Sequence, residues 1–122
     1  MILVDTSIWV DHLRIADAAL IQLLDARRVV THPLVIGELA LGNLRNRGRF
    51  LDTFNNLPCT VVASDWEVMQ FIDRHELFGF GIGYIDAHLL AAVRLTLGTA
   101  LWTRDKRLLR AAERLAVAAN LS

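Results

Sequence analysis

The chain has 122 residues, of which 54% are hydrophobic and 21% are charged. The charges interrupt every apolar run, so no segment approaches the roughly 18 consecutive apolar residues of a membrane span. The single cysteine excludes an internal disulfide and a thiolate metal cage. The 13 basic and 13 acidic residues cancel, which ordinarily argues against a nucleic-acid partner because phosphate binding favours a basic surface.

The length fits one domain over residues 1–122, and no linker-like segment divides it. The N-terminal MILVD lacks the basic segment, apolar block and cleavage site of a secretory signal. We therefore expect a cytoplasmic protein without a membrane partner. The mean hydropathy of +0.39 is high for a chain of this size, and the surplus apolar surface suggests a homo-oligomer or an obligate partner.

The first half of the chain opens on a short apolar run, Met1 to Val4, which is typical of a strand buried on both faces. Asp5-Thr6-Ser7 follows and can cap a helix that carries Ile8 and Trp9. The pattern then predicts a helix over 18–26, a strand near 28–31, a helix over 33–44, a break over 45–49 and a short helix over 50–55.

The second half is predicted to begin with a strand over 60–62. Ser64 and Glu67 then form a capping box that opens a helix to about residue 78. After a glycine-rich loop over 79–83, the pattern predicts a helix over 84–97, a strand over 100–102, a helix over 104–114 and a final short strand over 115–118. This alternation predicts an α/β fold: a three-layer sandwich with a central, mainly parallel, four- to five-stranded sheet.

Two acids follow predicted strands. Asp5 comes directly after the first strand, and Asp105 follows the strand over 100–102, with Thr103 between. The carboxyl ends of parallel strands form the edge where such sheets bind ligands. Each acid can also be interpreted as a simple helix N-cap. The hydroxyl of Thr103 is placed to orient a neighbouring carboxylate.

Two further acids lie on predicted helices with apolar faces. Glu38 has Leu34, Val35 and Leu41 as its helical neighbours, so its carboxylate is costly there unless it is paired or binds a metal. Asp86 heads an apolar stripe in the first turn of its helix, where the helix dipole alone also favours a carboxylate. A solvated rim glutamate and a dipole-stabilised aspartate remain the simpler alternatives for these two residues.

Together the four acids predict a site with oxygen ligands only. Such a site selects Mg²⁺ or Mn²⁺ over Zn²⁺, and its chemistry would be phosphodiester hydrolysis. Setting these four aside leaves nine acids against 13 bases, which weakens the charge argument against a nucleic-acid substrate. Twelve of the bases are arginine, a residue suited to bidentate phosphate contacts.

Four segments carry a family resemblance: MILVDTSIWVDHLR, VIGELALG, GYIDAHLLAA and LWTRDKRL. They resemble the four acidic motifs of PIN-domain nucleases, and the VapC toxins of bacterial toxin–antitoxin pairs are the most similar type. The motifs run in family order from residue 1 to residue 108. The resemblance therefore covers almost the whole chain.

The resemblance implies that Asp5, Glu38, Asp86 and Asp105 are the metal-binding and catalytic acids, with Thr103 as a supporting hydroxyl. It also implies a Mg²⁺- or Mn²⁺-dependent endoribonuclease that inhibits translation. The partners it implies are an RNA substrate, a VapB-type antitoxin protein and a second copy of the chain in a homodimer.

Basic residues near the predicted site are candidates for RNA contacts. Arg104 and Lys106 flank Asp105 in the sequence, and Arg14 is a further candidate. For three other arginines that could contact phosphate, a solvated loop face is the favoured interpretation: Arg45, Arg47 and Arg49.

Two other functions fit parts of the pattern. An aspartate-based phosphatase or phosphoacceptor domain would use Asp5 as the nucleophile, but such sites usually have a second acid where this chain has Ser7. A non-catalytic PIN-like binding module would keep the fold and only dock a partner. Phosphoryl transfer to Asp5 would identify the first alternative, and a lack of divalent-cation affinity would favour the second.

Overall fold

The computed structural model describes residues 1–121, so Ser122, the last residue of the predicted domain, lies outside them. Three parallel strands form the sheet: β1 (Ile2–Val4), β2 (Val29–Val30) and β3 (Ala100–Trp102). Their order is β2-β1-β3, with Leu3 opposite Val30 on one side and Leu101 on the other. The central strand is buried throughout, as its uninterrupted apolar run predicts.

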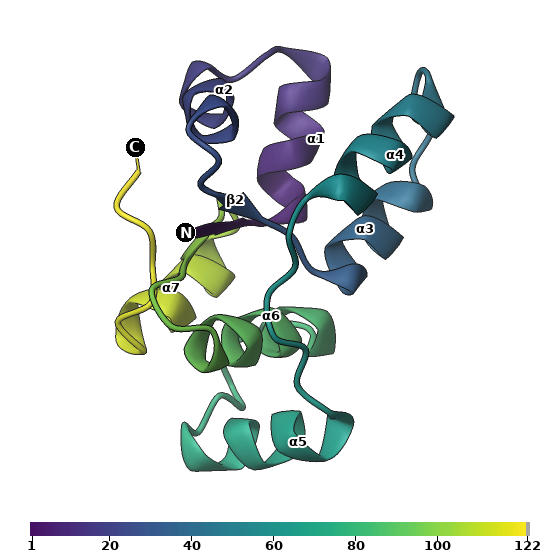
Figure 1. Cartoon of the computed structure of the whole chain (residues 1–122). Helices are drawn as coiled ribbons and strands as arrows, with labels where there is room; N and C mark the ends of the chain where they lie inside the picture. The colour runs from purple at the N-terminus through teal and green to yellow at the C-terminus, as the bar shows by residue number, and fades with distance from the viewer. Residues whose placement is uncertain (122) are drawn as a thin grey trace.

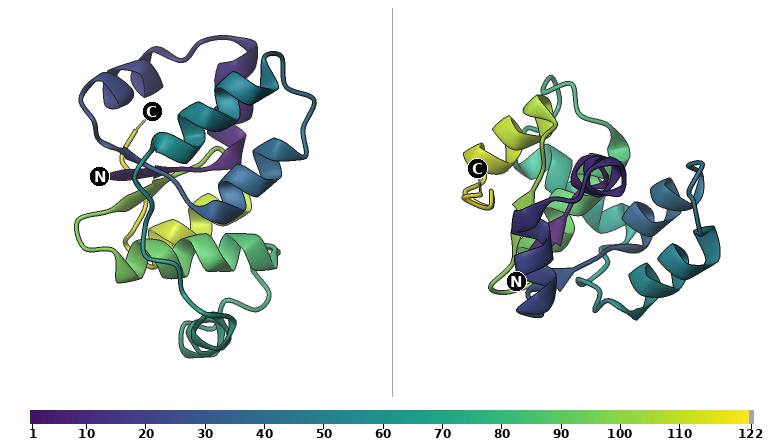
Figure 2. Two further views of the ribbon diagram at one scale, coloured as in Figure 1. Left: turned by 45° about the vertical axis from the view of Figure 1, so that its right-hand side comes forward. Right: turned by 90° about the horizontal axis from the view of Figure 1, so that it is seen from above.

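Seven helices connect and cover these strands. They are α1 (Thr6–Arg14), α2 (Ala18–Asp25), α3 (Pro33–Ala40), α4 (Arg47–Asn56), α5 (Asp65–Arg74), α6 (Tyr84–Leu95) and α7 (Lys106–Arg114). Figure 1 and the left view of Figure 2 show α1, α2 and α4 on one side of the sheet and α6 and α7 on the other. The predicted α/β sandwich with a parallel sheet is thus confirmed. None of these helices, within the described residues, is long and apolar enough to cross a bilayer.

Helix α6 lies in the interior of the molecule. Seven consecutive residues from Ala87 to Val93 are buried, so both faces of the helix are covered. One face packs on β3, and α5 packs on the other, where Figure 1 shows it as an outer layer beyond α6. A helix that is apolar on all sides requires such double cover, and this fixes the first turn of α6 beside the sheet.

The predicted count of four to five strands is wrong for this structure. The two expected outer strands are reduced to single parallel bridges, Thr31 with Cys59 and Leu101 with Ala118. On one side the chain leaves the sheet because the N–H of Val61 donates to Thr96 Oγ1 instead. On the other side, the N–H of Val117 donates to the Ala112 carbonyl at the end of α7.

The expected break over 45–49 and the helix start at 50 are also wrong. Helix α3 ends at Ala40, and α4 already begins at Arg47, so the connection spans residues 41–46. Arg47 Nη2 donates to the Ala40 carbonyl over 2.7 Å, which satisfies an otherwise open carbonyl at the end of α3. Arg47 therefore joins the two helices rather than separating them.

The helix after the capping box is shorter than predicted. Ser64 and Glu67 form the capping box as expected, but α5 ends at Arg74 rather than near residue 78. Glu76 adopts a left-handed conformation with φ 51°, and the N–H of Leu77 donates back to the Ile72 carbonyl. This arrangement stops a helix without needing glycine.

Candidate active site

Asp5 lies at the carboxyl edge of the sheet, between the ends of β1 and β3. Its backbone N–H donates to the Trp102 carbonyl over 2.9 Å, and only 5% of the residue is exposed. The side chain makes no capping bond to α1. Instead, its Oδ2 accepts hydrogen bonds from Ser7 Oγ at 2.8 Å and Thr103 Oγ1 at 2.7 Å.

Asp105 is joined to Asp5 through Thr103. Its backbone N–H donates to Thr103 Oγ1 over 3.0 Å. Its own Oδ1 accepts the N–H groups of Arg107 and Leu108 at 2.9 and 3.1 Å. Asp105 is therefore the N-cap of α7, as the simpler interpretation proposed, and one of its carboxylate oxygens is held in place at the sheet edge.

Glu38 reaches the same edge from α3. Thr6, the first residue of α1, donates its hydroxyl to Glu38 Oε1 over 2.8 Å. This bond joins residues that are 32 positions apart in the chain. Since Thr6 directly follows Asp5, the bond brings the Glu38 carboxylate beside the Asp5 backbone.

Asp86 occupies the first turn of α6, where its Oδ2 accepts the N–H of Gly83 at 3.3 Å. Burial raises the pKa of this carboxyl to about 6, against the lowering effect of the Gly83 hydrogen bond. The negative charges of Asp5, Asp105 and Glu38 raise the pKa further. The other three predicted acids thus lie close enough to Asp86 to repel its charge.

The cluster carries uncompensated negative charge. Within residues 1–121, none of the four carboxylates forms an ion pair with an arginine, lysine or histidine. No group of three or more histidine, cysteine, aspartate or glutamate side chains in this range is arranged to hold a metal ion. Converging oxygens without a cationic side chain nevertheless match the donor set that hard divalent cations prefer. The residues present therefore fit such a cation in their chemistry.

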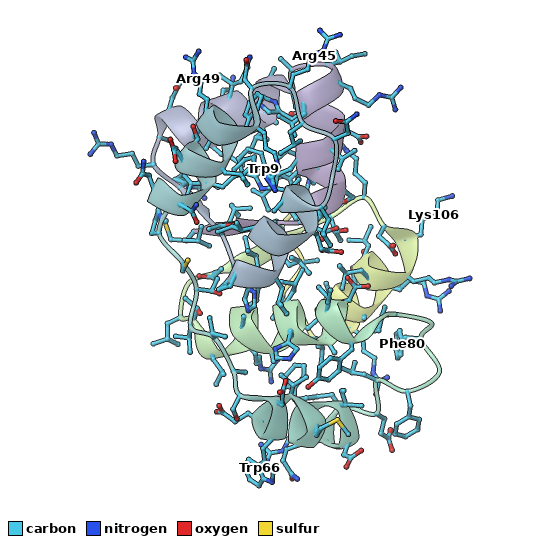
Figure 3. The ribbon with its side chains drawn as sticks, turned by 90° about the vertical axis from the view of Figure 1, so that its right-hand side faces the viewer. Trp9, Arg45, Arg49, Trp66, Phe80 and Lys106 are labelled. Carbon is cyan, nitrogen blue, oxygen red and sulfur yellow. The ribbon has the colours of Figure 1, made fainter. Side chains whose placement is uncertain are left out.

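Of the three predicted RNA contacts, Arg104 is engaged within the protein. Its guanidinium bonds Asp11 at 2.8 Å and Asp17 at 2.5 Å, and this lowers the pKa of Asp17. Lys106 projects outward at the start of α7, as Figure 3 shows. Arg14 is exposed at the end of α1.

The sequence interpretation treated Thr6 and Ser7 only as helix caps, and the structure gives them other partners. Both hydroxyls bond acids of the site, Thr6 to Glu38 and Ser7 to Asp5. Ser7 Oγ also accepts the N–H of Arg104 at 3.1 Å. Two hydroxyl residues directly after a strand-end aspartate were the available signal, because such residues can either cap the helix or bond the carboxylate.

Comparisons with known proteins identify the family of this chain. The family model of the PIN domain matches residues 2–114. Ribonuclease VapC32 of Mycobacterium tuberculosis is 51% identical over 108 residues in strain CDC 1551 / Oshkosh, covering 88% of this chain and 87% of the relative. The protein of the same name in strain ATCC 25618 / H37Rv matches to the same extent. The chain therefore belongs to the PIN-domain family and is of the VapC type.

Proposed function

We propose that this chain is an endoribonuclease that hydrolyses RNA phosphodiester bonds and acts as the toxin of a toxin–antitoxin pair. The observation that carries the proposal is the meeting of Asp5, Glu38, Asp86 and Asp105 at one sheet edge, where none of them forms an ion pair with any residue from 1 to 121. The similarity to a relative named as a ribonuclease supports RNA as the substrate class. Inhibition of translation is the expected consequence of cleaving cellular RNA.

The proposed cofactor is Mg²⁺ or Mn²⁺. Asp5 and Asp86 would hold it most directly, with Glu38 and Asp105 completing the carboxylate set. When bound, such a cation activates water for attack on phosphorus and offsets the charge on the leaving oxygen. The raised pKa of Asp86 supports this assignment, because a half-buried carboxylate beside three others is stabilised by a positive charge.

The chain's own residues orient the site. Ser7 and Thr103 hold Asp5 Oδ2, and no residue from 1 to 121 donates a hydrogen bond to the other oxygen, Oδ1. Thr6 holds Glu38 Oε1. Each hydroxyl thereby fixes one carboxylate before any substrate arrives, and such preorganisation is what a nuclease site requires. Lys106 and Arg14 remain the proposed phosphate contacts.

The proposed partners are an antitoxin protein of the VapB type and a second copy of the chain. Large apolar side chains stay exposed, among them Trp66 at 70%, Leu41 at 91% and Leu97 at 96%. Figure 3 shows Trp66 at the far end of the molecule from Arg45 and Arg49. The exposed apolar side chains support the proposal of protein partners. We place the proposed activity in the cytoplasm, where cellular RNA is accessible.

Purified protein tests the proposed activity. We expect wild type to cleave RNA with Mg²⁺ or Mn²⁺ and to lose cleavage in excess EDTA. Asp5→Asn should abolish cleavage while its thermal unfolding stays cooperative, because the amide keeps the shape of the side chain and loses its charge. Full activity in EDTA would refute the proposed metal dependence, and unchanged activity of folded Asp5→Asn would refute the site.

An experiment in cells can identify the RNA target. After brief expression of wild type and Asp5→Asn, the 5′ ends of cellular RNA are mapped and compared. New ends confined to wild type would identify the target, and co-expression of the antitoxin should remove them. Identical end profiles for both proteins would count against a nuclease and would favour a non-catalytic binding module.

A further inference from the structure

Two histidines face each other in the interior, between α3 and α6. His32 is fully buried and His88 is 6% exposed. Their ring centroids lie 6.3 Å apart, with the ring planes at 60°. His32 Nε2 and His88 Nδ1 are both buried, and neither has a hydrogen-bond partner among the protein groups of residues 1–121. Buried polar atoms are rarely left unpaired, so these two require an explanation.

The hydrogen bonds of His32 determine which of its nitrogens carries the proton. Its Nδ1 accepts the N–H of Leu34 over 3.0 Å and thereby caps α3. A nitrogen that accepts cannot hold the proton, so the neutral ring carries it on Nε2. Burial lowers the pKa of His32 to about 4, which keeps the ring neutral at pH 7. His32 Nε2–H is therefore a buried donor without an acceptor.

His88 has one paired nitrogen. Its Nε2 lies 3.1 Å from Asp65 Oδ1. The hydrogen bonds from Tyr84 and His88 lower the pKa of Asp65, so this carboxylate is ionised and can only accept. His88 Nε2 therefore carries the proton that it donates to Asp65, which leaves Nδ1 as the unpaired atom of this ring. Each of the two neighbouring rings thus has one buried nitrogen that no protein group pairs, His32 Nε2 and His88 Nδ1.

Thr60 supplies a third unpaired atom in this region. The bridge between Thr31 and Cys59 is parallel, so the next residues in register, His32 and Thr60, are neighbours with side chains on the same face. Thr60 is 5% exposed, and its Oγ1 is also buried without a partner. A hydroxyl both donates and accepts, so it can complete either kind of hydrogen bond.

We propose that one internal water molecule occupies the space between these residues. It accepts from His32 Nε2–H and makes its other two hydrogen bonds with His88 Nδ1 and Thr60 Oγ1. Buried waters typically make about three hydrogen bonds to groups that are otherwise unpaired. A metal ion does not fit here, because it needs a lone pair from each histidine and His32 Nε2 holds a proton.

The proposed water joins two helices of the fold. His32 caps α3, and His88 belongs to α6. The chain of contacts runs from Asp65 through His88, the water and His32 to the backbone of α3. It is an internal polar link between the two helices. This link requires no bound metal or RNA, so it can be tested independently of the proposed nuclease activity.

Nuclear magnetic resonance of the uniformly ¹⁵N-labelled wild-type chain tests the proposal without any variant. We expect both rings in the Nε2–H form and a cross-relaxation signal between the His32 Hε2 proton and a long-lived water. A scalar coupling between His32 Nε2 and His88 Nδ1 would reveal a direct bond and overturn the proposal. A proton on His32 Nδ1, or no signal to water, would overturn it equally.

A double-mutant cycle measures whether the two histidines are energetically linked. His32→Asn keeps an acceptor for the Leu34 N–H and removes Nε2, while His88→Phe keeps a ring and removes both nitrogens. We expect the combined variant to change the unfolding equilibrium constant less than the product of the single effects, by a factor on the order of ten. Effects that multiply would contradict the link.

His12 provides the matched control for this cycle. Its Nδ1 also accepts a backbone N–H, from Asp17 at 3.0 Å, but it belongs to α1 on the other side of the sheet from α6 (Figure 2). His12→Asn combined with His88→Phe should therefore give effects that multiply. A non-multiplicative result for this pair as well would show that the coupling is not specific to the proposed water, and would overturn it.

Discussion

Single hydroxyl groups orient the carboxylates at the sheet edge. Ser7 is the clearest case, because its Oγ donates to Asp5 Oδ2 and accepts the N–H of Arg104. A side chain that holds a metal ligand through a hydrogen bond typically contributes 10- to 100-fold in metal affinity or activity, an order-of-magnitude range. Ser7 thus acts on the proposed metal through Asp5 rather than by direct contact.

Ser7→Ala should raise the Mg²⁺ concentration for half-maximal RNA cleavage by about tenfold. The reason is that Asp5 loses one of the two hydroxyls that hold its Oδ2. Ser64→Ala is the matched control, since Ser64 caps α5 through the N–H of Glu67. It should cost about 1 kcal/mol of stability and leave the Mg²⁺ dependence unchanged. Equal Mg²⁺ dependence of wild type and Ser7→Ala would refute the role of Ser7.

His32 makes stability depend on pH. In the unfolded chain it takes up a proton near pH 6.5, whereas in the folded protein its pKa is about 4. Between these values the unfolded chain binds more protons, so the free energy of unfolding falls as the pH decreases from 6.5 towards 4. The loss attributable to this histidine reaches about 3 kcal/mol.

His32→Asn should remove this part of the pH dependence, because asparagine still accepts a backbone N–H but does not titrate. Urea denaturation of both proteins at pH 7 and at about pH 4.5 measures it. His75, whose pKa is also lowered by burial, contributes equally to both proteins and cancels in the comparison. Identical losses of stability on acidification would contradict a neutral, buried His32.

The sequence predicted which acids meet and that Thr103 orients a carboxylate, but not that Ser7 joins Thr103 on the same oxygen of Asp5. Asp5 and Asp105 are recognisable because they follow strands, and Glu38 and Asp86 because they interrupt apolar helix faces. The sequence could not show that both hydroxyls bond Asp5 together, since Ser7 and Thr103 are 96 positions apart and meet only in the folded protein. Likewise, only the structure shows that Arg104 binds Asp11 and Asp17. The catalytic and metal-binding roles of the acids stay predictions.

At the scale of elements, several helices end on left-handed residues that are not glycine. After α7, Ala116 has φ 58°, and the N–H of Val117 donates back to the Ala112 carbonyl. Alanine is strained in this conformation, while glycine adopts it freely. The left-handed residue at the end of α7 also turns the chain, and Ala118 then forms a single bridge to Leu101 of β3.

Ala116→Gly should therefore raise the free energy of unfolding by about 0.5–1 kcal/mol, which chemical denaturation can measure. Arg110→Gly, on the exposed side of α7, is the control and should lower the same quantity by about 1 kcal/mol. Destabilisation by Ala116→Gly would contradict the strain assigned to this helix end.

Element types were easier to predict than element ends. Apolar periodicity placed the core of each helix and the three sheet strands, because burial of one face is a local property of the sequence. The prediction of two outer strands was wrong, because the length of such a strand depends on which groups compete for its backbone hydrogen bonds. The N–H of Val61 bonds Thr96, the residue that follows α6, rather than a neighbouring strand, and the N–H of Val117 bonds the end of α7. Arg47 similarly lies within α4 because it bonds the end of α3.

At the scale of the whole molecule, the fold concentrates negative charge at one edge and leaves apolar surface elsewhere. The formal net charge of zero, from 13 bases and 13 acids, does not reveal this local cluster of negative charge. Asp5, Glu38, Asp86 and Asp105 come from four separate segments, and the parallel sheet together with the buried helix α6 brings them together. We propose that this edge binds one or more divalent cations.

A Mn²⁺ titration followed by electron paramagnetic resonance tests that claim most directly, because free Mn²⁺ is measured without substrate or antitoxin. Wild type should bind Mn²⁺, and Asp86→Asn should bind it more than about tenfold more weakly. Asp73→Asn removes an equal charge from the exposed side of α5 and should bind like wild type. Equal Mn²⁺ affinity of all three proteins, or no binding by wild type, would refute the proposed cation site.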